Sequence, residues 1–213
     1  MADVTIEDGI IRVKDLDIQD GKAAKVLEEY PEARWPEITR RVPAARLVFL
    51  GARGSRKTLL SSALRNESRE YLARIDTLLN ALSDPTSVRF VGEVPNVEDY
   101  YRSADAFVFC SSQEGLPNAV VEAMACGLPC LLTHFIGFPA DEFGRAGSEF
   151  IETRSNPRAI ADHVVELLEN REKSLELGRR ARKWVTTHLD IEDAIDAYAR
   201  LYRELAGVAP RRG

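Results

Sequence analysis

The sequence contains no long apolar stretch and no recognisable export signal. No apolar run approaches the length of about 18 residues that a membrane-spanning helix needs, so we expect no such helix. The opening residues, "MADVTIEDGI", lack the apolar core of a signal peptide. From these two absences we expect a cytoplasmic protein.

The sequence also has few cysteines, and its net charge is negative. The three cysteines, Cys110, Cys126 and Cys130, are an odd number, which does not fit a framework of paired disulfides. The C-x3-C spacing of the last two lacks the further ligands of a zinc site, so we expect small buried thiols and no metal. The formal net charge of −5 disfavours a nucleic-acid-binding domain, which is usually basic.

Apolar residues are plentiful and occur in short runs. Hydrophobic residues make up 45% of the 213 residues, enough for a sizeable core. From about residue 45, apolar runs of strand length alternate with segments in which apolar residues recur at helical spacing. The predicted strands are RLVFLG (46–51), SVRFVG (87–92), AFVFCSS (106–112), PCLLTH (129–134) and EFIET (149–153).

The helical segments between these runs complete an alternating pattern. We expect a helix over 71–82, a short helix capped by Asn96, a helix from Pro117 to Gly127, and a tail over 156–205 that is almost entirely helical. Alternating strands and helices pair in parallel through right-handed crossovers. The predicted fold is therefore α/β: a Rossmann-like doubly wound parallel sheet with a helical C-terminal tail.

The first part of the chain is harder to interpret. "GIIRVKDL" has the character of a strand and "AAKVLEEY" that of a helix, but prolines interrupt the pattern that follows. We therefore divide the chain into residues 1–44, a strand and helix of uncertain role, and residues 45–213, the main domain. In a doubly wound sheet, ligands bind beyond the carboxyl ends of the strands, so the site should lie in loops that follow strands.

One such loop resembles a nucleotide-triphosphate site. "LVFLGARGSRKTLL" places Gly51, a basic loop and Lys57-Thr58 after a strand. A P-loop needs a second glycine directly before the lysine, and that position is Arg56. An arginine side chain would crowd the space where backbone amides must approach phosphate, so we do not expect Gly51–Thr58 to bind ATP.

The segment 111–129 carries the densest group of candidate functional residues. Glu114 follows a predicted strand, Gly115 allows the backbone to approach a ligand closely, and the first-turn amides of the next helix favour an anion. Asn118 and Glu122 are four residues apart and share one helical face. The pattern suits a ligand with a central phosphate between hydroxyl-rich groups. Taken alone, the spacing fits at least as well two carboxylates that are merely solvated.

The segment "EGLPNAVVEAMACGLP" resembles the E-x7-E segment of retaining glycosyltransferases of the GT-B fold, and most closely their family-4 group. The order of the flanking segments, from "LVFLG" through "VRFVGEVPNVEDYYRSADAFVFCSS" to "YARLYREL", is also similar over residues 45–205. The resemblance implies that this chain is the C-terminal half of a GT-B fold, the half that binds a nucleotide-diphospho-sugar donor. It also implies retaining transfer of a hexose-type sugar without a cofactor or metal.

Roles for single residues follow from the resemblance. Glu114 is implied to be the catalytic residue, in contact with hydroxyls of the transferred sugar. Glu122 is implied to contact the ribose hydroxyls, with the diphosphate at the amides between the two carboxylates and the base beside Gly92 and Val94. The implied donor-binding residues are Gly115, Leu116, Pro117, Asn118, Glu122, Gly92 and Val94.

Two differences from the family bear on activity. The family holds the diphosphate with an Arg and a Lys in the loop after its first strand, ending in a Lys-Gly pair, whereas Asp20 precedes Gly21 here. The basic candidates near that position are Arg12, Lys14 and Lys22. Family enzymes are nearly twice this long, so we expect an acceptor-binding domain or second subunit, with peripheral membrane association through the acceptor. The alternative is a non-catalytic, glycosyltransferase-like module that acts through a partner.

Overall fold

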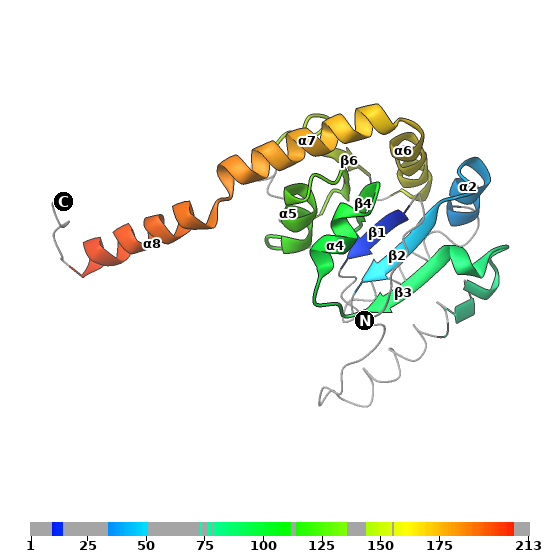
Figure 1. Ribbon diagram of the computed structural model, residues 1–213, viewed down its shortest axis with the longest axis horizontal. Coiled ribbons are helices and arrows are strands. Elements are labelled where there is room, and N and C mark those ends of the chain that lie inside the picture. The colour runs from blue at the N-terminus through cyan, green and yellow to red at the C-terminus, as the bar shows by residue number, and fades with distance from the viewer. Residues whose placement is uncertain are drawn as a thin grey trace.

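The computed structural model describes residues 10–14, 34–50, 73, 76–77, 79–111, 114–135, 144–154 and 156–206. Within these ranges the chain forms one sheet flanked by helices, and a last helix extends away from it (Figure 1). The strands are β1 (Ile10–Lys14), β2 (Arg46–Leu50), β3 (Val88–Gly92), β4 (Ala106–Phe109), β5 (Cys130–Thr133) and β6 (Ile151–Thr153). The helices are α2 (Arg34–Arg41), the 3-10 turn η2 (Pro85–Ser87), α4 (Val97–Arg102), α5 (Asn118–Ala125), α6 (Pro157–Glu169), α7 (Arg171–His188) and α8 (Ile191–Leu205).

The six strands form a single sheet in the order β3-β2-β1-β4-β5-β6, and every pair is parallel. The predicted doubly wound α/β sheet is therefore confirmed, and all five strands predicted after residue 45 are present. The chain builds outward from β1 in one direction through β2 and β3, then returns to the other side of β1 with β4. The direction in which successive strands are added across the sheet therefore reverses, and β1 and β4 are the neighbouring strands at this reversal.

Strand β1 lies inside the sheet and pairs with β2 on one side and β4 on the other. Its residues Ile11 and Arg12 are in register with Ala106 and Phe107 of β4. Part of the segment 1–44, whose role was uncertain from the sequence, therefore belongs to the sheet, which begins before residue 45. Helix α2 in the same segment packs against α6, and Arg41 pairs with Asp162 at 3.3 Å.

Alternate residues of the strands are buried on opposite faces of the sheet. On one face, Leu47, Phe49 and Val108 join a core formed with α2 and α6. On the other, Phe107 and Phe109 pack in a second core formed with α4, α5 and part of α7. Because both faces are covered, β4 and β5 are buried along their whole length and are largely apolar, as parallel strands in such folds usually are.

The helix termini follow from local sequence. Asn156 caps α6, and its side chain accepts hydrogen bonds from the N–H groups of Arg158 and Ala159, as the sequence predicts. Gly127 adopts a left-handed conformation with φ of 79° just beyond α5, which ends that helix. Pro117, expected in the first turn of α5, is instead its N-cap residue. Asn96 likewise caps α4, but its side chain donates to Asp99 Oδ2 at 2.9 Å and caps no backbone group.

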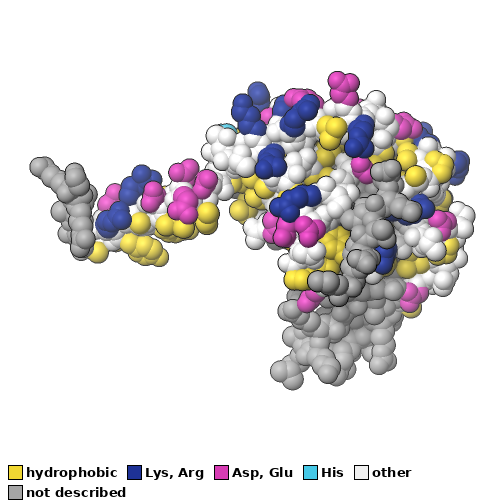
Figure 2. Space-filling model, in the orientation of Figure 1, with side chains coloured by type: hydrophobic (Ala, Val, Ile, Leu, Met, Phe, Trp, Pro, Cys, Tyr) yellow, Lys and Arg dark blue, Asp and Glu magenta, His cyan; other side chains and the backbone are white. Residues whose placement is uncertain are grey.

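The last helix, α8, differs from the others because none of its residues is buried. It projects from the end of α7 away from the sheet (Figure 1). Its apolar side chains lie on one side, visible as a continuous apolar stripe in Figure 2. The exposed large side chains of this stripe are Ile191, Ile195, Tyr198, Leu201, Tyr202 and Leu205. Across the described residues, no helix is both long enough and apolar enough to traverse a membrane.

Candidate functional site

The segment that follows β4 lies at the point where the strand order reverses. Strands β1 and β4 are neighbours, while the chain continues from β1 toward β2 and from β4 toward β5. Crevices beyond the carboxyl ends of strands at such a reversal are the usual ligand sites of open parallel sheets. Glu114 follows β4 at this end of the sheet, in the segment that leads into α5.

A network of hydrogen bonds ties Glu114 to the sheet. The Ser111 hydroxyl donates to Glu114 Oε1 at 2.7 Å. The Ser111 N–H donates to Thr133 Oγ1, and the Thr133 hydroxyl donates back to the Ser111 carbonyl, both at 3.1 Å. Ser111 and Thr133 are buried, so these bonds join the ends of β4 and β5 inside the protein. The half-buried Glu114 carboxylate is therefore held by a side chain that is itself anchored to two strands.

Glu122 occupies the second turn of α5 and is also half-buried. The Tyr101 hydroxyl, from α4, donates to Glu122 Oε2 at 3.2 Å. The opposite side of α5 carries Ala119, Val120, Ala123 and Met124, all buried against the sheet, as the sequence predicts. Helix packing thus directs Glu122 away from the core and toward α4.

The start of α5 combines an uncapped helix terminus with an open backbone. Pro117 makes no side-chain capping hydrogen bond, and a proline has no N–H of its own. The Val120 N–H donates to the Pro117 carbonyl at 2.9 Å, but the earliest amides of a helix usually have no intrahelical partners and favour an anion. Gly115, Leu116 and Asn118 are exposed, whereas Pro117 is buried. A Cβ atom built on Gly115 would meet no atom of the described residues within 4 Å.

The segment after β3 lies beside the carboxyl ends of β2 and β3. Gly92 adopts a left-handed conformation with φ of 88°. Val94 is half-buried and packs against a small cluster of Val48, Leu50 and Tyr100. The apolar contacts of Val94 tie this segment to the ends of β2 and to α4.

The basic candidates occupy different positions along β1. Lys14 is the last residue of that strand, in register with Leu50, and Arg12 lies inside the strand. Lys22 and the whole of Gly51–Thr58 lie outside the described residues. The described residues include no group of three or more His, Cys, Asp or Glu side chains arranged to hold a metal ion.

Three residues of this neighbourhood were missed by our sequence analysis: Tyr101, Ser111 and Thr133. Each stands in or beside a predicted strand or helix, and each side chain is buried with a hydroxyl that forms a hydrogen bond. Polar groups in otherwise apolar elements are the signal that could have identified them, because a buried hydroxyl needs a partner.

The three thiols have little exposure. Cys130 is buried, and Cys110 and Cys126 are half-buried, all three as free cysteines. Burial raises the pKa of the Cys130 thiol well above its usual range, and burial also raises the pKa of the Cys126 thiol. The predicted buried thiol is confirmed for Cys130. Both raised values disfavour the reactive thiolate.

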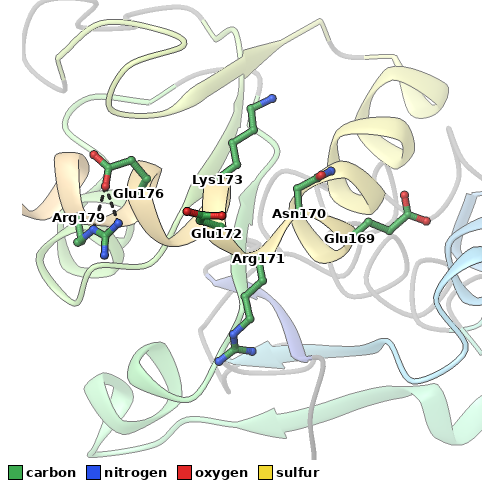
Figure 3. A pocket seen from close by; sticks show the side chains of 7 residues that line it. All are labelled: Glu169, Asn170, Arg171, Glu172, Lys173, Glu176 and Arg179. Atoms are coloured by element: carbon green, nitrogen blue, oxygen red, sulfur yellow. Dashed lines mark hydrogen bonds and ion pairs between the residues drawn. The ribbon is translucent and has the colours of Figure 1, made fainter.

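Two hollows in the described part of the chain lie away from the carboxyl ends of the strands. One, of about 570 Å³, is an open depression at the junction of α6 and α7. Figure 3 shows charged side chains of both signs around it, with Arg179 paired to Glu176 at 2.6 Å. The other, of about 480 Å³, lies at the amino ends of β4 and β5, where Asp105 and Arg171 pair at 3.7 Å. Neither contains Glu114 or Glu122.

The chain is similar to parts of longer proteins. It is 27% identical over 118 residues to the N-acetyl-alpha-D-glucosaminyl L-malate synthase of Bacillus anthracis, covering 55% of this chain and 31% of that protein. It is 32% identical over 152 residues to spore coat protein SA of Bacillus subtilis, covering 70% of this chain and 37% of that protein. The chain therefore matches about a third of the length of these relatives.

Solved structures share the fold at lower identity. Sucrose-phosphate synthase from Thermosynechococcus elongatus superposes with a TM-score of 0.70 at 22% identity, over 95% of this chain and 47% of that one. HepE from Anabaena, in complex with UDP-glucose, gives 0.70 at 15% identity, over 93% and 50%. The C-terminal domain of the group 1 glycosyl transferase LpcC from Francisella tularensis gives 0.60 at 18% identity, over 86% and 87%.

These likenesses agree with the predicted half of a GT-B fold. The matched half corresponds to the C-terminal domain region of GT-B glycosyltransferases. The family model described as glycosyl transferases group 1 matches residues 25–184, which include five of the six strands and the segment between Glu114 and Glu122. The chain belongs to the family of group 1 glycosyl transferases.

Proposed function

We propose that this chain binds a nucleotide-diphospho-sugar and presents it for retaining transfer of a hexose-type sugar to an acceptor. The observation that carries the proposal is the position of the Glu114 segment, where the strand order reverses and an uncapped helix begins. Relatives support the ligand class, since one similar protein is a GDP-mannose-dependent mannosyltransferase of Mycobacterium tuberculosis and HepE was solved with UDP-glucose. Because β1 lies within the sheet, the proposed donor domain includes Ile10–Lys14 as well as residues 45–213.

We assign the two carboxylates to the two hydroxyl-rich ends of the donor. Glu114 accepts hydrogen bonds from the sugar, and Glu122 accepts them from the ribose. The diphosphate lies at the exposed start of α5, where backbone N–H groups and the helix dipole favour its charge. The remaining proposed contacts are Gly115, Leu116, Pro117 and Asn118 along the donor, Gly92 and Val94 beside the base, and Arg12, Lys14 and Lys22 as phosphate candidates.

The proposed reaction needs stabilisation of a leaving group more than it needs a strong base. The bond between the anomeric carbon and the diphosphate oxygen breaks, and the diphosphate leaves with the bonding electrons. The acceptor hydroxyl bonds to the same carbon on the same face and passes its proton to the departing diphosphate oxygen. Hydrogen-bond donors that already point toward the growing negative charge stabilise such a transition state. In the proposed site, backbone amides and basic side chains act in this way, and no metal is needed.

We place the acceptor on a surface outside this chain, supplied by another domain or by a second subunit. The chain spans about a third of its relatives' length, and the full reaction needs both substrates held in reacting geometry. The apolar stripe of α8 is the described surface best suited to contact such a domain, since Tyr198 and Tyr202 are 63% and 66% exposed (Figure 2). Exposed apolar stripes of this kind mark interaction sites.

A second candidate is a non-catalytic module that keeps the fold and works through a partner. It is favoured by Asp20, which precedes Gly21 where active family members carry a basic residue. The two proposals predict different affinities of the chain for the diphosphate group. An active donor domain binds nucleoside diphosphates more tightly than the corresponding monophosphates, whereas a module without basic phosphate ligands shows no such preference.

The test is calorimetric titration of the 213-residue chain with UDP-, GDP- and ADP-sugars, followed by Glu122→Ala. We expect one nucleotide to bind, and Glu122→Ala to weaken it by about 1–3 kcal/mol, the usual cost of losing a charged hydrogen-bond acceptor. Glu98→Ala is the matched control, since it removes the same charge from an exposed position on α4. Equal affinity in the Glu122 and Glu98 variants would remove Glu122 from the ribose site.

A further inference from the structure

We propose that two hydroxyl groups, those of Tyr101 and Ser111, are positioning residues that orient the two carboxylates of the donor site. Tyr101 orients Glu122 and Ser111 orients Glu114. The inference rests on the proposed function, because that function assigns the sugar to Glu114 and the ribose to Glu122. It goes beyond that function by naming the residues that fix each carboxylate before the ligand arrives.

Tyr101 is a rigid donor because its ring is enclosed by the core. Only 1% of its surface is exposed. Its ring meets Phe107 edge-on, with centroids 5.7 Å apart and planes at 88°, and both belong to the core beneath α5. The ring cannot swing away without opening that core, so its hydroxyl stays directed at Glu122 Oε2, 3.2 Å away. Helix α4 thereby sets the orientation of a carboxylate on α5.

Ser111 is held through its backbone as well as its side chain. Its N–H and C=O both bond to the hydroxyl of Thr133, a residue of β5 that is 1% exposed. This reciprocal pair fixes the chain directly after β4. The Ser111 hydroxyl then donates to Glu114 Oε1 at 2.7 Å, a length typical of a strong bond to a charged acceptor. Two strands therefore determine the orientation of Glu114.

Holding the carboxylates in place favours binding through entropy. A free glutamate side chain samples many rotamers, and freezing them on ligand binding opposes association. A hydroxyl that already holds one carboxylate oxygen removes part of this cost and leaves the orientation of the other oxygen defined. Each hydroxyl therefore acts through its carboxylate and needs no contact with the ligand.

The two hydroxyls should have separable effects, because their carboxylates contact different parts of the donor. The ribose is present in the nucleoside diphosphate and in the complete nucleotide-sugar, so Tyr101→Phe should weaken the binding of both. The sugar is present only in the complete donor, so Ser111→Ala should weaken the nucleotide-sugar and leave the nucleoside diphosphate unchanged. Loss of one hydrogen bond corresponds to a reduction of about two- to tenfold.

The experiment is calorimetric titration of wild type, Tyr101→Phe and Ser111→Ala with the nucleotide-sugar that wild type binds best and with its nucleoside diphosphate. Ser174→Ala is the matched control, since Ser174 is also buried but its hydroxyl donates to the Leu167 carbonyl, between α6 and α7. Each variant is repeated in the Glu122→Ala or Glu114→Ala background. We expect the effect of each hydroxyl to disappear when its own carboxylate is removed.

The possible failures are distinguishable. Three results would overturn the positioning role and leave the proposed function standing. The effect of a hydroxyl could persist after its carboxylate is removed, or it could match the effect of Ser174→Ala. Ser111→Ala could also weaken the binding of both ligands equally. Unchanged affinities in Tyr101→Phe and Ser111→Ala would do the same. If wild type binds none of the nucleotide-sugars, the proposed function is wrong, and the positioning inference fails with it.

Discussion

Replacing Gly115 by alanine separates the requirements of the fold from those of the ligand. Gly115 is exposed, its backbone is outside the left-handed region, and no atom of the described residues lies within 4 Å of where the new methyl group would stand. The folded chain therefore accepts alanine. Such a substitution stabilises a protein by about 0.4–1 kcal/mol, because alanine restricts the unfolded chain more than glycine does.

The same methyl group should be costly when the donor is bound. In the proposed site the donor approaches the backbone at Gly115, so the methyl group occupies space that the ligand needs. Overpacking one carbon into a close contact costs about 1–3 kcal/mol. That range corresponds to an affinity about 5- to 150-fold weaker. The expected signature is thus unchanged or increased thermal stability together with weakened binding.

Calorimetry measures both quantities on one preparation: scanning for the unfolding transition, and titration with the nucleotide-sugar that wild type binds. Unchanged affinity in a variant that folds normally would refute the reasoning, because the ligand would then not approach Gly115. A lowered transition temperature would refute it differently, by showing that the fold itself requires glycine at this position.

Two further predictions concern packing and activity. Gly178→Ala should lower the free energy of unfolding by about 1–3 kcal/mol in a denaturant titration. The new methyl group would lie 2.0 Å from the Gly127 carbonyl oxygen, so the backbone would have to move. Wild-type stability in this variant would contradict the close approach of α7 to the end of α5. The 213-residue chain alone should bind donor but transfer no sugar to added acceptors, as followed by product chromatography, and robust transfer would show that the acceptor surface lies within this chain.

Much of the fold was predictable because its signals are local. The runs that became β4 and β5 are largely apolar and buried throughout, and Asn156 with Pro157 marks the start of α6. Strand β1 was harder to place, since its position between β2 and β4 depends on pairing with residues more than thirty positions away. A strand's place in a sheet is a tertiary property that its own residues do not specify.

The candidate site was predictable in its position but not in its supporting contacts. Glu114 and Glu122 stand out through their spacing around a helix start, and the segment between them lies at the strand reversal, the usual ligand position in open parallel sheets. The bonds from Ser111 and Tyr101 join side chains on different elements. Such pairs become visible only when the strands and helices are packed, because nothing in the sequence gives the distance between α4 and α5.

The most direct test of the central claim is a crystal structure of the chain with the nucleotide-sugar that binds it. We predict the diphosphate at the first turn of α5, the ribose hydroxyls within hydrogen-bond distance of Glu122, and the sugar hydroxyls within reach of Glu114. Nucleotide bound instead at Gly51–Thr58, or in the charged depression between α6 and α7, would contradict the account.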